Sequence, residues 1–277
     1  MSDEPGSTTV EDPPPRAPAH AAPATSSLGD WVRLVLRGVG QTLITAGMVI
    51  LLFVVYEVYI TNVFAHRQQV KVHSALEKQW AKGRDPLALP GGASSSIPIG
   101  DGIANIYIPR FGKDFAFTIV EGTDDASLEK GPGHYTGTAL PAETGNFAVA
   151  GHRVGKGEPF LNLDRLKTGD TVIIETKAEW YVYVVKGAHG DVTALDADGI
   201  PGRQIVSPSD GNVIRPVPNH PSTRPTEKLI TMTTCHPKFT ATQRMVVYGI
   251  LNPKLTVPRS GSSMPSSISA LYDKVGS

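Results

Sequence analysis

The stretch KLITMTTCHPKFTATQRMVVYGIL (residues 228–251) carries the clearest β-hairpin pattern of the chain. Its two ends are apolar and β-branched runs, 228–235 and 243–251, and the pattern predicts two antiparallel strands joined by a loop. A pairing centred between positions 239 and 240 sets Cys235 opposite Arg244. Directly opposed residues have Cβ atoms about 4.5–5.5 Å apart, so the guanidinium can reach the space above the thiol.

Similar short runs recur upstream, separated by turn residues. They are 103–110, 115–122, 146–153, 171–176, 180–188 and 211–218. With the last two runs they make eight strand candidates, and only short helical turns around 127–131 and 160–166 interrupt them. The chain also holds 28 glycines and 23 prolines, which suits many short strands. Together these features predict a single closed, mostly antiparallel β-barrel over residues 102–252.

A different kind of segment precedes the barrel. Residues 1–30 are rich in Pro, Ala and Ser, and we expect them to be disordered. GVGQTLITAGMVILLFVV (38–55) carries no charge, and spanning a bilayer takes about 20 such residues. A buried core helix is the alternative, but flanking arginines on one side and two tyrosines on the other favour a transmembrane helix over 36–60.

Between this helix and the barrel we expect a juxtamembrane stalk and a Gly-, Pro- and Ser-rich linker, 61–101. After the barrel, the tail 253–277 is expected to be mostly irregular. Basic residues flank the span on both sides, so the positive-inside rule does not fix its orientation. Those residues are Arg33 and Arg37 before it, and Arg67, Lys71 and Lys78 after it.

Composition excludes several functional classes. The 26 basic and 26 acidic residues balance, which gives no support for a nucleic-acid partner. The single cysteine excludes an intramolecular disulfide and a multi-thiolate zinc site. Two loops carry clustered carboxylates that suit calcium, but such runs are usually only solvated, so we predict no metal and no cofactor. These carboxylates are Glu121, Asp124 and Asp125, and Asp191, Asp196 and Asp198.

The lone thiol needs a basic or cationic neighbour to act as a nucleophile, since an unperturbed thiol is mostly protonated at neutral pH. His236 is adjacent in sequence, but neighbouring strand residues point to opposite faces. His152 ends a predicted strand, where its side chain can emerge at the barrel rim. His134 lies in GPGHYTG, a loop that can line a cleft, whereas His189 and His220 lie in polar loops. An inert buried cysteine remains the alternative.

TMTTC (231–235) resembles the Thr-Leu-x-Thr-Cys signature of sortases, the cysteine transpeptidases of Gram-positive cell surfaces. GHR (151–153) is similar to the sortase histidine segment, and Arg244 follows the cysteine by nine residues. The runs GPGHYTGTALPAETGNFAVAGHR and TTCHP look most like class E sortases of high-GC Gram-positive bacteria. Met232 departs from the signature leucine, and we expect its side chain to point away from the face of Cys235, with volume conserved.

The resemblance implies an eight-stranded sortase-type β-barrel with short helices and assigns roles to its residues. Cys235 is the nucleophile that forms a thioacyl-enzyme at the Thr–Gly bond of a sorting signal. His152 is the acid and base, and Arg244 holds the substrate backbone or stabilises the oxyanion. Thr234 is expected to help position the substrate.

Further substrate-binding candidates are Tyr107, Tyr135 and His134. Class E sortases are thought to prefer LAXTG over LPXTG signals, and either tyrosine is a candidate for that preference. The implied partners are surface proteins that carry a sorting signal, the amine of a lipid II-like peptidoglycan precursor, and the membrane. Because these substrates are exported, the resemblance implies a single-pass membrane protein with a cytoplasmic N-terminus and an extracellular barrel.

Three other functions stay open. A pilin-polymerising sortase would use a pilin lysine as acceptor, although residues 85–102 offer no aromatic residue as a lid plug. A membrane-tethered binding module would leave Cys235 structural. A hydrolytic thiol protease would release the same thioester to water.

Overall fold

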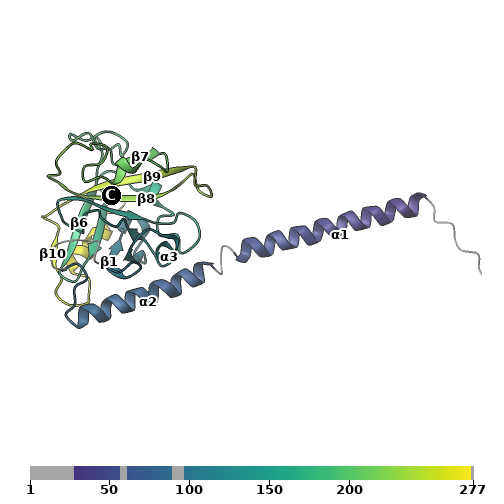
Figure 1. Ribbon diagram of the computed structural model, residues 1–277, viewed down its shortest axis with the longest axis horizontal. Coiled ribbons are helices and arrows are strands. Elements are labelled where there is room, and N and C mark those ends of the chain that lie inside the picture. The colour runs from purple at the N-terminus through teal and green to yellow at the C-terminus, as the bar shows by residue number, and fades with distance from the viewer. Residues whose placement is uncertain (1–27, 57–60, 89–96, 276–277) are drawn as a thin grey trace, which may run out of the picture. The chain divides into compact units, whose positions relative to one another are not determined.

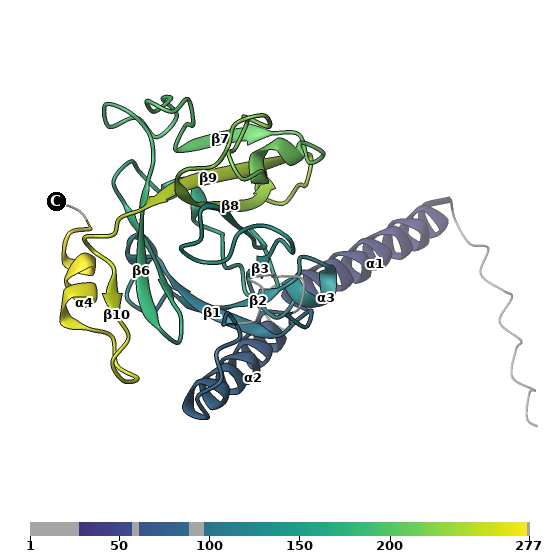
Figure 2. The same cartoon turned by 60° about the vertical axis from the view of Figure 1, so that its left-hand side comes forward.

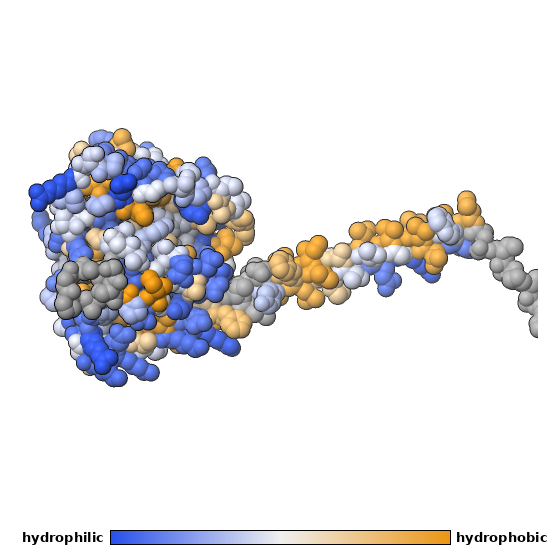
Figure 3. Space-filling view, viewed as in Figure 1, coloured by the Kyte–Doolittle hydropathy of each residue, from blue (hydrophilic) through white to orange (hydrophobic). Residues whose placement is uncertain are grey.

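The computed structural model describes residues 28–56, 61–88 and 97–275 (Figure 1). The predicted disordered segment therefore lies outside the described residues except for 28–30, which belong to the first helix. The chain divides into two compact units, 1–52 and 53–277. Helix α1, Leu28–Val55, is mostly hydrophobic on its surface (Figure 3) and is long and apolar enough to cross a membrane. The expected N-terminal apolar helix is thus confirmed.

The second unit contains a closed eight-stranded β-barrel, as predicted. Around the ring the order is β6, β5, β1, β2, β3, β4, β8, β9, and a β6–β9 pairing closes it. Strands β2 and β3 pair in parallel, as do β4 and β8, and the other neighbours are antiparallel. The bounds are β1 Gly102–Tyr107, β2 Ala116–Glu121, β3 Gly133–His134, β4 Gly145–Ala150, β5 Thr171–Glu175, β6 Glu179–Val185, β8 Lys228–His236 and β9 Gln243–Leu251.

One predicted strand, 211–218, is wrong. Its first part forms a 3-10 helix, η5 Gly211–Ile214, which Asp210 caps by accepting a hydrogen bond from the backbone of Asn212. Pro216 and Pro218 follow, and proline cannot donate to a strand ladder. The eighth strand of the ring is instead the two-residue β3. The strand β7, Arg203–Val206, pairs outside the ring with β9, and β10, Val257–Pro258, pairs with β6.

Alternating side chains fill the barrel interior. On β8 and β9 the inward residues are Ile230, Met232, Met245 and Val247, all buried in one cluster with Phe147 and Val149 of β4. Met232 therefore points into the barrel, on the opposite side of the strand from Cys235, as expected. Two short helices lie near the expected turns: α3 Asp125–Leu128 and η4 Leu163–Arg165. A third, η3 Pro109–Phe111, follows β1.

Helix α2, Thr61–Ala81, is a packed part of the barrel unit, whereas the sequence predicted a stalk. Its Leu76 and Trp80 are 1% and 5% exposed. Gln69 accepts a hydrogen bond from the backbone N–H of Thr118 (2.7 Å) and donates to its carbonyl (2.9 Å). These bonds satisfy the backbone N–H and C=O groups of Thr118 in β2, at a position where the two-residue β3 is too short to pair with it.

The C-terminal segment also packs on the barrel, and within the expected mostly irregular tail it contains one short helix. Helix α4, Ser266–Asp273, buries Ile268 and Leu271 against Trp180 of β6 (Figure 2). At eight residues this helix is too short to be stable by itself in water. Packing against β5 and β6 stabilises it instead.

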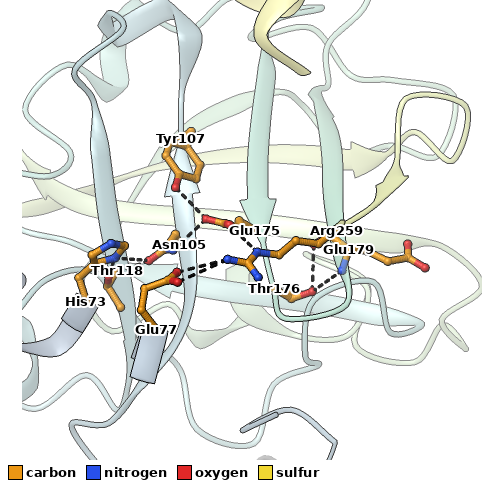
Figure 4. Close-up of polar contacts among 9 residues, drawn as sticks. All are labelled: His73, Glu77, Asn105, Tyr107, Thr118, Glu175, Thr176, Glu179 and Arg259. Carbon is orange, nitrogen blue, oxygen red and sulfur yellow. Dashed lines mark hydrogen bonds and ion pairs between the residues drawn. The ribbon is translucent and has the colours of Figure 1, made fainter. Parts of the chain in front are cut away.

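A polar cluster joins both flanking segments to the barrel (Figure 4). The buried carboxylate of Glu175 accepts hydrogen bonds from Asn105 (2.9 Å), Tyr107 (2.8 Å) and Arg259 (2.7 Å). Arg259 also pairs with Glu77 of α2 at 3.4 Å. The cluster thereby connects α2, β1, β5 and the C-terminal segment through one carboxylate.

Candidate active site

Strands β8 and β9 bring the thiol and the guanidinium to the same place. Cys235 is paired directly with Arg244, as the sequence predicts, and the thiol is half-buried. Because inward positions on these strands are 232, 245 and 247, both residues belong to the outward set. The Arg244 guanidinium donates to the carbonyl of Ala241 (3.0 Å) in the β8–β9 connection and to that of Gln243 (3.1 Å) at the start of β9.

Strand β4 carries the histidine to the same end of the sheet. It runs parallel to β8, and the last paired residues are Ala150 and Thr233. Two residues further along each chain, the same register sets His152 beside Cys235. Two hydrogen bonds continue the connection past the strand: Gly151 N–H to the Thr233 carbonyl (3.0 Å), and the Thr234 hydroxyl to the Gly151 carbonyl (2.8 Å).

Glycine at position 151 is required by the packing. A Cβ atom there would lie 2.6 Å from the Phe160 ring, which is in the barrel core. Gly151 thus faces inward, and His152, the next residue, follows on the outward side with Cys235. His152, Cys235 and Arg244 therefore occupy three adjacent chain segments on one face of the barrel.

The surroundings of His152 favour its neutral form. Burial lowers the pKa of His152 below its ordinary value, and the nearby Lys156 cation lowers it further. The carboxylates of Asp125 and Glu129 act in the opposite direction. Its buried Nε2 makes no hydrogen bond within the described residues. No side chain or backbone group of the described residues therefore occupies this nitrogen.

The structure separates the predicted substrate-binding residues. Tyr135 donates to or accepts from the Thr233 hydroxyl at 3.0 Å, next to the strand end that bears the thiol. The Thr234 side chain is 2% exposed and is used in the bond to Gly151, so it joins β8 to β4 and does not line a surface.

Tyr107 and His134 lie elsewhere. Tyr107 is on β1, which is four strands from β8 in either direction around the ring, and it bonds to Glu175 (Figure 4). His134 does not line a cleft. It is fully buried in β3, with Nδ1 2.7 Å from Glu121 and its ring stacked on Phe147. Sequence spacing alone does not reveal which face of the barrel a residue occupies.

Most of the carboxylates considered for calcium have protein partners. Asp196 and Asp198 both pair with the buried ammonium of Lys186, at 3.0 and 2.8 Å. Asp124 caps α3 by accepting hydrogen bonds from Ser127. The part of the chain that the structure describes holds no group of three or more His, Cys, Asp or Glu side chains arranged for a metal ion.

A buried arginine at this site was quoted in the sequence as part of GHR but was given no role. Arg153 is 4% exposed and contacts the carbonyl of Cys235 and the side chain of His236. One feature of the sequence could have indicated a role for Arg153: it is a charged residue directly after the inward Gly151 and the outward His152.

Comparison with known proteins shows which family the barrel belongs to. A family model described as Sortase domain matches residues 106–252. The chain therefore belongs to the sortase family, a family of transpeptidases. Among its relatives, Sortase SrtE1 of Streptomyces coelicolor is 37% identical over 220 residues, covering 77% of this chain and 56% of SrtE1. Sortase SrtE2 of the same organism is 32% identical over 222 residues, covering 76% of this chain and 80% of SrtE2.

Solved structures agree with this assignment. The SrtF sortase from Corynebacterium diphtheriae is 39% identical with a TM-score of 0.56, covering 62% of this chain and 93% of that one. The SrtA sortase from Actinomyces oris is 33% identical with a TM-score of 0.53, covering 62% and 90%. The predicted resemblance to sortases, and to class E in particular, is confirmed. The chain spans just over half the length of SrtE1.

Proposed function

We propose that the chain is a membrane-anchored sortase that cleaves an LAXTG- or LPXTG-type sorting signal between Thr and Gly. It then transfers the acyl part to an amine of a cell-wall precursor. The observation that carries this proposal is the convergence of Cys235, His152 and Arg244 on one face of the barrel, through the β8–β9 pairing and the parallel β4–β8 register.

In the first half-reaction, the Cys235 sulfur attacks the carbonyl carbon of the signal threonine, and the thiol proton passes to His152. The carbon–nitrogen bond to glycine breaks, and His152 returns the proton to the leaving amine. A thioester remains on Cys235. The lowered pKa of His152 supports this role, because a neutral imidazole is needed to accept the thiol proton.

In the second half-reaction, an acceptor amine loses a proton to His152 and attacks the thioester carbon. An amide forms, the carbon–sulfur bond breaks, and the thiolate of Cys235 recovers the proton. The proposed acceptor is the amine of a lipid II-like peptidoglycan precursor, and the donors are surface proteins that carry the sorting signal. No metal or cofactor takes part in either half-reaction.

Arg244 supplies the positive charge for the oxyanion or for the substrate backbone. Its hydrogen bonds go to the carbonyls of Ala241 and Gln243, and a substrate carbonyl would replace them. Among the remaining candidates, Tyr135 is the one that the Thr233 contact puts beside the nucleophile strand. Thr234 and Tyr107 have their side chains engaged elsewhere, and His134 is fully buried.

The proposed topology sets α1 in the cell membrane as a single span, with the N-terminus in the cytoplasm and the barrel outside. Helix α1 meets the length and hydropathy requirements for a span. The outside location follows from the substrates, since both exported proteins and the cell-wall acceptor are found there.

The test is mass spectrometry of the full chain after incubation with LAXTG and LPXTG peptides, with and without an amine. We expect a covalent adduct on Cys235 and an amide product when amine is present. Cys235→Ala and His152→Ala are expected to lose both, while Lys238→Ala, on an exposed loop residue, keeps them. A Cys235→Ala variant that still transfers the peptide would refute the proposal.

Varying the acceptor amine in the same experiment distinguishes the cell-wall sortase from the alternative functions. Release of free acid despite added amine would identify a hydrolase, and preference for a pilin lysine would identify a polymerising sortase. Absence of any adduct on wild-type Cys235 with every peptide would favour the non-catalytic binding module.

A further inference from the structure

Two hydrogen bonds hold the nucleophile and histidine segments together past the strand pairing, and they join Gly151 to Thr233 and to Thr234. Beyond them the β4–β8 ladder stops, so the backbone bonds do not fix the separation between His152 and Cys235. A reaction that moves one proton between these two side chains depends on that separation. Some other contact has to set it.

The Arg153 side chain makes that contact. It directly follows His152, and its Nη1 lies 2.8 Å from Nδ1 of His236, the residue directly after the nucleophile. The same Nη1 donates to the Cys235 carbonyl at 3.4 Å. Arginine has no acceptor, so His236 Nδ1 must carry the lone pair. One guanidinium therefore links the chain that bears His152 to both residues at the end of β8.

Asp164 orients this guanidinium from the other side. Its carboxylate, on η4, lies 3.2 Å from Nη2 of Arg153. Because Arg153 is 4% exposed, its side chain has little freedom once this pair forms. The 3-10 helix that carries Asp164 is itself anchored by Leu163 in the barrel core.

We propose that Arg153, held by Asp164, is a positioning residue of the transpeptidation reaction. It replaces the missing ladder bonds and sets the distance between the His152 imidazole and the Cys235 thiol. It touches no substrate atom in this role, and it acts on the rate of chemistry and not on substrate binding. The inference rests on the proposed function, since it needs the thiol and imidazole to exchange a proton.

The experiment compares Arg153→Gln with a matched buried pair. Arg110 and Asp170 form a second Arg–Asp pair, with side chains 18% and 8% exposed, on the segments that follow β1 and precede β5. Arg110→Gln therefore loses a similar ion pair away from the thiol. Acyl-enzyme formation on LAXTG peptide is measured in single turnover, and KM and kcat in steady state, at a temperature where circular dichroism shows each variant folded.

We expect Arg153→Gln to lower kcat about 10²-fold, because misplacement of reacting groups by about 1 Å has that effect, with KM changed little. Millimolar methylguanidine should restore part of the rate by filling the vacated site, whereas a denatured or loosened barrel would not respond. Arg110→Gln should keep kcat despite reduced stability. Arg153→Lys should stay impaired, because one ammonium does not reproduce the planar fork.

Asp164→Asn keeps the neighbouring shape and serves if Arg153→Gln does not fold. It should lower kcat by a smaller factor, again at nearly constant KM. Wild-type kcat in Asp164→Asn and Arg153→Lys, or a loss in KM alone, would overturn the inference. These results are distinct from failure of the proposed function, which would appear as absence of the Cys235 adduct in the wild-type chain.

Discussion

The Glu175 carboxylate provides the sharpest test of how α2 and the C-terminal segment are attached. Glu175→Gln keeps the side-chain shape but replaces one oxygen by an NH2 group. Oε2 accepts from Asn105 and Tyr107, and Oε1 accepts from Arg259, so the new NH2 must face at least one donor. Whichever orientation the amide takes, a buried donor loses its acceptor.

The expected cost follows from the burial of the pair. Glu175 is 4% and Arg259 10% exposed, and removing one partner of a buried ion pair costs about 3–5 kcal/mol. Arg259 keeps Glu77 at 3.4 Å, so the lower end applies, about 3 kcal/mol. For a unit of this size that corresponds to a fall in Tm of about 6–12 °C.

The assay is urea-induced and thermal unfolding of the full chain in detergent, followed by circular dichroism. Glu129→Gln is the matched control, because Glu129 pairs with Lys156 at 2.9 Å but is 56% exposed, and such a surface pair contributes less than about 1 kcal/mol. A double-mutant cycle with Arg259→Met isolates the pair. A change below about 1 kcal/mol in Glu175→Gln would refute the assignment of a structural ion pair.

Two further predictions concern the histidine and the helix. Because burial and the Lys156 cation lower the pKa of His152, the imidazole should become protonated below pH 6.5, and kcat/KM should fall over that acidic range. Lys156→Gln should raise the pKa of His152 and so move the acidic fall of kcat/KM to higher pH. A move to lower pH would contradict the assignment. Gln69→Leu leaves both backbone groups of Thr118 without their α2 partner, and unfolding free energy should fall by about 2–4 kcal/mol, whereas Gln68→Leu, exposed on the same helix, should change it little.

Local pattern was enough for most of the barrel. Seven of the expected strands correspond to elements of the ring because each is a short apolar run with flanking turn residues. The run 211–218 failed because its apolar residues do not alternate toward a shared face and two prolines interrupt it. The strand that takes its place in the ring has two residues, which is too short for any periodicity to detect.

In the candidate site, too, some contacts could be predicted from local sequence and others could not. The opposition of Cys235 and Arg244 followed from counting along a hairpin, since antiparallel register is local. The approach of His152 depends on a parallel pairing between segments about 80 residues apart, and such a pairing has no local signal. The burial of His134 against Glu121 and the location of Tyr107 across the barrel follow from ring closure.

The amino-acid sequence was sufficient for seven of the ring strands, the apolar helix, the lone thiol with its opposed arginine, and the resemblance to sortases. These features depend on periodicity and on residue type, which act over a few residues. Only the tertiary structure decided that α2 and α4 are parts of the barrel unit and that Arg153 ties the histidine segment to the nucleophile segment. Those contacts join positions distant in the chain, and only closure of the barrel brings them within bonding distance.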